Sequence, residues 1–232
     1  MTFAVPDGKA GTANSGVTTE ERSMTAAAET QARSRFDFEP LAERYDRWYE
    51  TRAGMTYDLA QKIDVLRLLG LGRTGARLLD VGCGTGHWSD FFATLGYAVV
   101  AVDLSPGMIK VAHGRYKSGI SHYVADAGAL PFKDASFSIA AAMATIEFVI
   151  SPLKALREMA RCVRIGGRMI IGTLNRCAPL NRRRVQEGRE PYASAHLYSP
   201  EELHELLRPF GRLRMVASNP DEPLWASNGD AW

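Results

Sequence analysis

Three glycines stand at alternate positions, Gly82, Gly84 and Gly86, directly after the apolar run 78–81. Glycine lets the backbone adopt positive φ angles and lets a ligand approach the main chain closely. A helical pattern follows at once, because apolar residues recur with spacing i, i+3, i+4 and i+7 from Trp88 to Leu95. The stretch is therefore predicted to be strand, glycine turn and helix, with free N–H groups at the helix start. This chemistry suits a nucleotide-like or carboxylate-bearing ligand.

Carboxylates stand where the later predicted strands end. Asp103 closes the apolar run 98–103, about 20 residues after the glycines, where an acid typically binds ribose hydroxyls. Asp126 closes the next run, and Glu147 follows the one after. Ligands of parallel sheets bind beyond the carboxyl ends of the strands, so these acids are expected near a single ligand.

Strands and helices alternate along the chain, which predicts an α/β three-layer sandwich with a mostly parallel sheet. The predicted strands cover residues 78–81, 98–103, 122–126, 137–143, 168–173 and 213–217. The predicted helices cover residues 41–49, 57–69, 88–95, 105–113, 151–163 and 199–207. The two helices that precede the first strand are expected to cap the sheet or the ligand cleft.

The bulk composition excludes several classes of function. The 232 residues carry a formal net charge of +2, which gives no reason to expect nucleic acid as a partner. No apolar run reaches the ~20 residues that cross a bilayer, so stable membrane insertion is not expected. The cysteines Cys83, Cys162 and Cys177 are odd in number and lack the spacing of metal ligands. We therefore expect a reduced, cytoplasmic setting and no metal.

The chain is expected to contain one folded domain. Residues 1–35 are rich in small and polar side chains, with Phe3 as the only aromatic before Phe36, and are predicted to be a disordered tail. Residues 36–232 are predicted to form the domain. Met24 is an alternative start of the chain.

The glycine spacing separates two classes of cofactor. Gly82, Gly84 and Gly86 form G-x-G-x-G, whereas dinucleotide-binding proteins use G-x-G-x-x-G. An NAD-type oxidoreductase is therefore disfavoured, and the choice depends on several motifs together.

Four motifs in order resemble the class I S-adenosylmethionine-dependent methyltransferases, in the small-molecule group related to the ubiquinone and menaquinone biosynthesis methyltransferases. They are residues 79–86 (LDVGCGTG), 102–108 (VDLSPGM), 126–137 (DAGALPF and DASF) and 158–167 (EMARCVRIGG). The resemblance covers residues 37 to about 210 and implies a Rossmann-like, seven-stranded sheet with S-adenosylmethionine at its carboxyl ends. Such sheets end in an antiparallel strand pair. Residues 219–232 contain Pro220, Pro223 and Gly229, so the last strand is expected to be irregular or missing.

The resemblance also implies which residues bind the cofactor. Asp103 would hold both ribose hydroxyls, Asp126 would accept from the adenine amino group, and Tyr45 would close over the cofactor. The full implied set is Tyr45, Asp80, Gly82, Cys83, Gly84, Gly86, Asp103, Leu104, Met108, Asp126, Ala127 and Met143. Within it, Cys83 is interpreted as a small filler of the glycine loop and not as a reactive thiol.

The residues expected near the methyl acceptor are indicated less specifically by the sequence. Glu147, His196 and Tyr198 are candidates for contact with a small-molecule acceptor, and residues 182–184 are three arginines that either grip an anion or are solvated. No catalytic residue is assigned. A cofactor-binding partner protein without catalysis is the second hypothesis, and the acceptor and the oligomeric state are left open.

Overall fold

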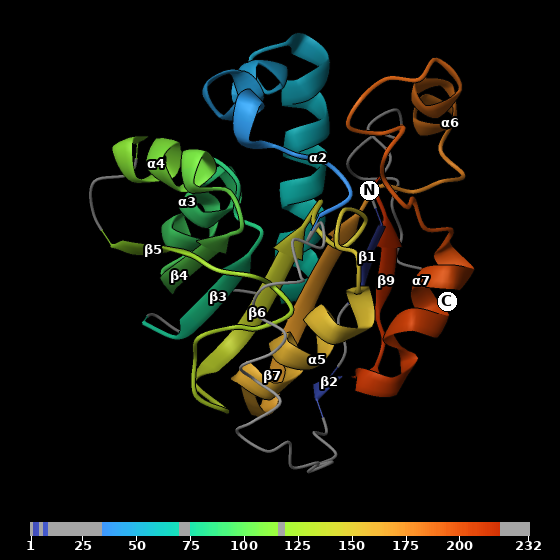
Figure 1. Cartoon of the computed structure of the whole chain (residues 1–232). Helices are drawn as coiled ribbons and strands as arrows, with labels where there is room; N and C mark the ends of the chain where they lie inside the picture. Colours follow the sequence, from blue (N-terminus) through green and yellow to red (C-terminus); the bar gives the residue numbers. More distant parts are fainter. Residues whose placement is uncertain (1, 5–6, 9–33, 70–74, 116–118, 219–232) are drawn as a thin grey trace, which may run out of the picture.

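A single mixed β-sheet dominates the computed structural model, which describes residues 2–4, 7–8, 34–69, 75–115 and 119–218. Its central order is β5-β4-β3-β6-β7-β1-β9 (Figure 1). Outside this order β2 pairs with β7 and with β8. The strands of the described residues are β1 (Thr2–Ala4), β2 (Asp7–Gly8), β3 (Arg77–Val81), β4 (Ala98–Asp103), β5 (Ile120–Val124), β6 (Phe137–Met143), β7 (Val163–Thr173), β8 (Gly211–Arg212) and β9 (Met215–Ala217).

The five strands from β5 to β7 are parallel, as predicted from their continuous apolar runs. In the middle of the sheet Leu79 pairs with Val100 on one side and Ala140 on the other. β7 begins at Val163, before the predicted start at residue 168, because residues 164–167 form an irregularity in its pairing with β6. Gly166 has a φ of 73° there, which glycine adopts without steric cost.

The antiparallel part of the sheet differs from the prediction. β1 lies between β7 and β9 and is antiparallel to both, with Phe3 opposite Gly172 and Val216. The expectation of disorder therefore does not hold for residues 2–4 and 7–8. The pairing partners of β1 are remote in sequence, and composition carries no signal for them. The predictions for residues 9–33, including Met24, and for residues 219–232 lie outside the described residues.

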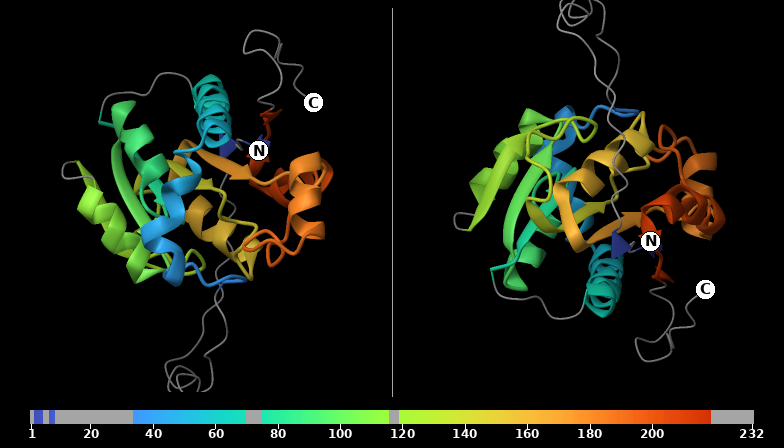
Figure 2. Two further views of the ribbon diagram at one scale, coloured as in Figure 1. Left: turned by 90° about the horizontal axis from the view of Figure 1, so that it is seen from above. Right: turned by 90° about the horizontal axis from the view of Figure 1, so that it is seen from below.

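Helices cover both faces of the sheet (Figure 2). Leu156, Met159 and Leu203 pack in one buried cluster, from α5 and α7. Val65, Leu68 and Phe92 pack in the other, from α2 and α3. The helical elements of the described residues are η1 (Glu39–Trp48), α2 (Arg52–Leu69), α3 (His87–Thr94), α4 (Pro106–Arg115), α5 (Pro152–Cys162), α6 (Pro179–Gln186), α7 (Pro200–Leu207) and η2 (Arg208–Phe210). None of these helices has the length and apolar character needed to cross a membrane.

The segment 34–48 covers the carboxyl edge of the sheet. Its first residues are fixed to the loop after β6, because the N–H of Arg35 donates to the carbonyl of Phe148 and Ser34 bridges to Val149. It continues as η1, a 3₁₀ helix where a regular helix over 41–49 was predicted. The loops that follow the parallel strands are thus enclosed by a segment from the N-terminal part of the chain.

Candidate functional site

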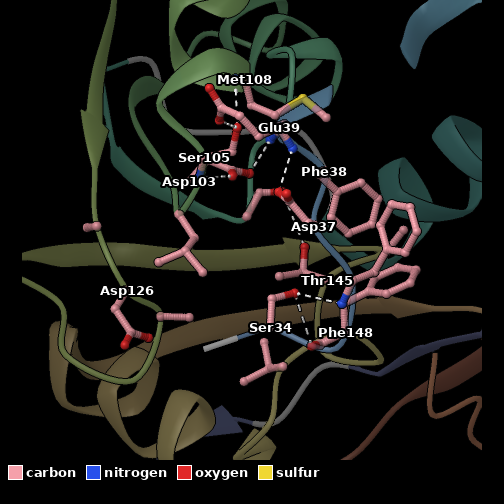
Figure 3. Close-up of a pocket in the computed structure, with 18 of the residues that line it drawn as sticks. Ser34, Asp37, Phe38, Glu39, Asp103, Ser105, Met108, Asp126, Thr145 and Phe148 are labelled. Atoms are coloured by element: carbon pink, nitrogen blue, oxygen red, sulfur yellow. Dashed lines mark hydrogen bonds between the residues drawn. The ribbon is translucent and has the colours of Figure 1, made fainter. Parts of the chain in front are cut away.

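A cavity of about 570 Å³ lies beyond the carboxyl ends of β3, β4, β5 and β6, and residues of the segment 34–48 line one side of it (Figure 3). Eight of the twelve residues implied as cofactor ligands line it: Tyr45, Gly82, Gly84, Asp103, Leu104, Met108, Asp126 and Ala127. This volume is typical of a small-molecule pocket.

The glycine turn provides a bare backbone wall for this cavity. Gly82 and Gly84 have φ angles of 69° and 56°, in the left-handed region that disfavours other residues. A side chain on Gly82 would collide with Thr145, whereas one on Gly84 would enter open space. The main chain at Gly84 is therefore accessible to a ligand in the cavity.

Asp103 is held in place at the end of β4. Its Oδ2 accepts from the N–H of Gly84 at 2.8 Å and its Oδ1 accepts from the N–H of Ser105 at 2.9 Å. Burial raises the pKa of this carboxyl, and the backbone donors work in the opposite direction. Each carboxylate oxygen has a further acceptor site, so Asp103 can still receive two hydroxyls from a ligand.

Asp126 lies apart from Asp103 in the cavity (Figure 3). Its Oδ1 accepts from the N–H of Gly128 at 2.8 Å, which fixes the turn after β5. The carboxyl therefore has a structural role and also an oxygen available for a ligand donor. Leu104 and Met108 add apolar side chains to the lining.

Asp80 lies at the end of β3, where the glycine turn begins, and does not line the cavity. It is almost fully buried, its Oδ2 accepts from the hydroxyl of Ser89 at 2.6 Å, and its Oδ1 has no hydrogen-bond partner within the described part of the chain. Burial raises the pKa of this carboxyl to about 7, and the charge of Asp103 adds to the effect. A cationic group near the turn would relieve both the desolvation and the missing partner.

The other implied ligands also lie behind the cavity wall. Cys83 and Met143 are buried in the core cluster formed with α2 and α3, and Gly86 precedes the first residue of α3. Burial raises the pKa of the Cys83 thiol well above its usual value, which suits a packing role and not a reactive one.

Segment 34–48 is attached to both the glycine turn and α4. Glu39 accepts from the hydroxyl of Ser105 and from the N–H of Gly107, the latter at 2.9 Å. Asp46 accepts from the hydroxyl of Thr85 at 2.6 Å and forms an ion pair with Arg115. Sequence reasoning expected this region to cap the cleft but did not identify these contacts.

The acceptor candidates do not line the cavity. Glu147 and Tyr198 are buried, whereas His196 is exposed. The N–H of His196 donates to the carbonyl of Glu147 at 2.8 Å, and the rings of His196 and Tyr198 are 4.7 Å apart. Arg182 and Arg183 are exposed, and the Arg184 guanidinium lies over the rings of Trp48 and Tyr192.

The charge of the lining restricts the ligand. Four carboxylates line the cavity, from Asp37, Glu39, Asp103 and Asp126. Among the described lining residues there is no lysine, arginine, histidine or cysteine. A pyrophosphate would meet uncompensated negative charge here, whereas a ligand with hydroxyls, an amino group and a positive centre would be stabilised.

Comparison with known proteins supports this interpretation of the site. A family model described as "Methyltransferase domain" matches residues 79–171. A demethylmenaquinone methyltransferase of Mycobacterium sp. (strain KMS) is 32% identical over 196 residues, which cover 84% of this chain and 76% of that protein. A demethylmenaquinone methyltransferase of Renibacterium salmoninarum is 38% identical over 135 residues, covering 51% and 56% of the two chains. The chain spans about half the length of several such curated relatives.

The fold has a similar counterpart among solved structures. It is a SAM-dependent methyltransferase of Thermotoga maritima, described as a possible histamine N-methyltransferase. The two structures superpose with a TM-score of 0.60 and 30% sequence identity, over 74% of this chain and 78% of the other.

Proposed function

Because this chain belongs to the family of S-adenosylmethionine-dependent methyltransferases, we propose that it transfers the methyl group of that cofactor to a small-molecule acceptor. The observation that carries the proposal is the cavity lined by four carboxylates without a described cationic side chain. This lining fits a ligand that is rich in hydrogen-bond donors and carries a sulfonium. It opposes the pyrophosphate of the dinucleotide alternative.

We propose a partner for each part of the cofactor among the residues in and around the cavity. We assign the ribose hydroxyls to Asp103 and the adenine amino group to Asp126, with Leu104, Met108 and Ala127 beside the adenine. The unpartnered Oδ1 of Asp80 supports a place for the amino acid part of the cofactor near the glycine turn. Tyr45 would cover the cofactor from η1.

The protein's own contribution is to align the acceptor with the methyl group, to enclose both molecules and to exclude water from them. When bound, the cofactor supplies a methyl group already activated on a positively charged sulfur. Fixing the acceptor in line with that methyl group can contribute up to ~7–11 kcal/mol to lowering the barrier. The segment 34–48 would exclude water from the cavity through its attachment to the loop after β6 and to α4.

We also propose a cytoplasmic setting, which the free cysteines Cys83, Cys162 and Cys177 support. The names of the relatives support a small molecule as the acceptor. The identity of that molecule is not part of this proposal.

The first prediction concerns Asp103. We expect Asp103→Ala to weaken the binding of S-adenosylmethionine and S-adenosylhomocysteine about 10- to 100-fold, because it removes charge-assisted hydrogen bonds to two hydroxyls. Isothermal calorimetry measures the effect. Asp134→Ala is the matched control, because Asp134 lies on an exposed loop before β6, at the opposite edge of the sheet.

Two outcomes would refute the proposal. One is the absence of S-adenosylmethionine binding by the unmodified chain, and the other is equal binding by the Asp103→Ala variant. Binding of NAD instead would restore the oxidoreductase hypothesis. Tight cofactor binding without turnover of any acceptor would favour the partner-protein hypothesis.

A further inference from the structure

Glu147 is a buried acid with an unsatisfied oxygen. Its side chain is fully enclosed, at 0% exposure, in the loop that follows β6. Oε1 accepts from the N–H of Leu174 at 3.2 Å, whereas Oε2 has no hydrogen-bond partner among the residues that the structure describes. Leaving a buried carboxyl oxygen unpaired costs about 1–3 kcal/mol or more, so packing alone does not account for this residue.

A second unsatisfied oxygen lies beside it. The hydroxyl of Thr173, at the end of β7, is buried and has no hydrogen bond of good geometry. A hydrogen bond from this hydroxyl to Glu147, too poor in geometry to satisfy either group, lowers the pKa of that carboxyl against a larger rise caused by burial. The loop after β6 and the end of the adjacent strand β7 thus bring two buried polar groups together.

Two tyrosines complete this polar cluster. Burial, and then the charge of Glu147, raise the pKa of the Tyr198 hydroxyl to about 12. Burial also raises the pKa of Tyr45, with smaller contributions from Glu147 and other neighbours. Thr173, Tyr45 and Tyr198 therefore each lie within electrostatic reach of Glu147, although the four residues come from separate segments.

The polar cluster lies next to the methyl end of the proposed cofactor position. Tyr45 lines the cavity, as do Thr145 and Phe148 on either side of Glu147 in sequence. Along the sheet, Asp126 follows β5, Asp103 ends β4 and the glycine turn follows β3. A cofactor laid out from adenine to sulfur in that order points its methyl group toward β6 and β7, where Glu147 and Thr173 lie.

We propose that Glu147 binds the methyl acceptor through an O–H or N–H group of the acceptor and receives its proton during methyl transfer. This inference rests on the proposed function. It restricts the acceptor to molecules with a protic nucleophile, and the two tyrosine rings favour an aromatic one. Tyr45 borders both the cavity and the polar cluster, so its movement would admit the acceptor.

The chemistry balances without another reactant. A lone pair on the acceptor oxygen or nitrogen forms the new bond to the methyl carbon, and the carbon–sulfur bond breaks with its electron pair left on sulfur. The acceptor proton passes to Oε2 of Glu147, which becomes a neutral carboxylic acid. The products are the methylated acceptor and S-adenosylhomocysteine. Burial raises the pKa of Glu147 to about 7, which is suitable for a proton acceptor near neutral pH.

The test compares protic ligands with their methylated counterparts. The protein is saturated with S-adenosylhomocysteine and titrated with phenol, catechol and aniline, and with anisole, 1,2-dimethoxybenzene and N,N-dimethylaniline, by ligand-observed NMR. We expect at least one protic ligand to bind about 10- to 100-fold more tightly than its counterpart. The phenol and aniline pairs distinguish hydroxyl from amine acceptors.

The matched variants are Glu147→Gln and Glu205→Gln. Glu147→Gln has the same shape and keeps an oxygen for the Leu174 N–H. We expect this variant to bind protic ligands less than about threefold more tightly than their methylated counterparts, which is a loss of the protic preference. Glu205→Gln, on the exposed face of α7, should leave the preference unchanged. Any panel member that is methylated should be turned over about 100-fold more slowly by Glu147→Gln.

Each outcome decides the inference. Absence of any protic preference in the unmodified protein, or a preference retained in Glu147→Gln, overturns it. Because the titration starts from S-adenosylhomocysteine, lack of binding at that first step refutes the proposed function. If S-adenosylhomocysteine binds but the ligand titration fails to show the expected preference, only the role of Glu147 is refuted. An unchanged thermal unfolding temperature shows that Glu147→Gln is folded.

Discussion

At the scale of residues, the site combines buried acids with a strained backbone. Asp80 and Glu147 are both buried, and each has one oxygen without a partner. Ala144, which lines the cavity, has a φ of 53°, and its N–H donates to the carbonyl of Gly172 at 2.7 Å. Unfavourable local geometry of this kind concentrates at functional sites, where the surrounding fold maintains it.

Asp80 predicts a pH dependence of stability. Its folded-state pKa is raised from 3.8 to about 7, so the folded protein retains a proton that the unfolded chain releases above about pH 4. Its contribution to stability is complete below that pH and is lost as the pH rises through 7. Asp80→Asn cannot ionise, so its stability relative to the unmodified protein should rise by about 3–4 kcal/mol between pH 4 and pH 8.

Urea unfolding at several pH values between 4 and 8 measures this difference. Asp134→Asn, with a carboxylate that is 77% exposed, serves as the control. A difference between Asp80→Asn and the unmodified protein that stays constant with pH would contradict the assignment of the raised pKa to Asp80.

Residues adjacent to a motif were predictable, whereas partners remote in sequence were not. Gly84, Asp103 and Asp126 line the cavity because each lies at the end of a strand or within three residues after one, and apolar runs predict these strands. Glu39 was missed, because its role depends on Gly107, 68 residues away. Nothing in the local sequence indicates such a contact.

At the scale of elements, the segment 34–48, which includes η1, works as a cover fixed at its ends. Ser34 and Arg35 attach one end to the loop after β6, Glu39 attaches the next part to α4, and Asp46 attaches the other end to Arg115. The cover therefore joins the two sides of the cavity.

Glu39→Ala should loosen this cover. The change removes the acceptor for the Ser105 hydroxyl and the Gly107 N–H, so we expect the cofactor to dissociate about 3- to 10-fold faster. Stopped-flow displacement measures the rate, and hydrogen exchange of residues 34–48 should increase. Glu43→Ala, exposed on the same element, is the control. If hydrogen exchange of residues 34–48 becomes faster but the cofactor dissociation rate does not change, the cover does not retain the cofactor.

For helices and strands too, local patterns were predictable and the effects of remote partners were not. The strands β4 and β6 match their predicted bounds, because continuous apolar runs end in turn residues. The start of β7 and the 3₁₀ character of η1 were not predicted, since pairing and docking partners far along the chain determine them.

At the scale of the whole molecule, the N-terminus completes the sheet. β1 occupies the antiparallel position that the C-terminal residues were expected to fill, and so joins β7 to β9. A three-residue strand in a polar segment has no recognisable pattern, which is why composition predicted a tail instead.

A chain that begins at Met24 lacks β1 and β2. We expect its thermal unfolding temperature to fall by at least about 5 °C, because β7 and β9 lose their shared partner. Phe3→Pro in the 232-residue chain should also lower the thermal unfolding temperature, since proline removes a hydrogen-bond donor from a strand that is paired on both sides. Equal unfolding temperatures for all three chains, measured by calorimetry, would show that β1 adds nothing to stability.

The position of β1 also determines when this strand can pair during translation. Residues 2–4 are the first of the described residues to leave the ribosome, yet they pair with residues 171–173 and 215–217. At ~5–20 residues per second, translation leaves this strand without partners for about 10–40 s. The parallel strands can associate during that time, but β1 can pair on both sides only after residue 217 has emerged. Of the described strands, the first to be synthesised is thus among the last to be paired.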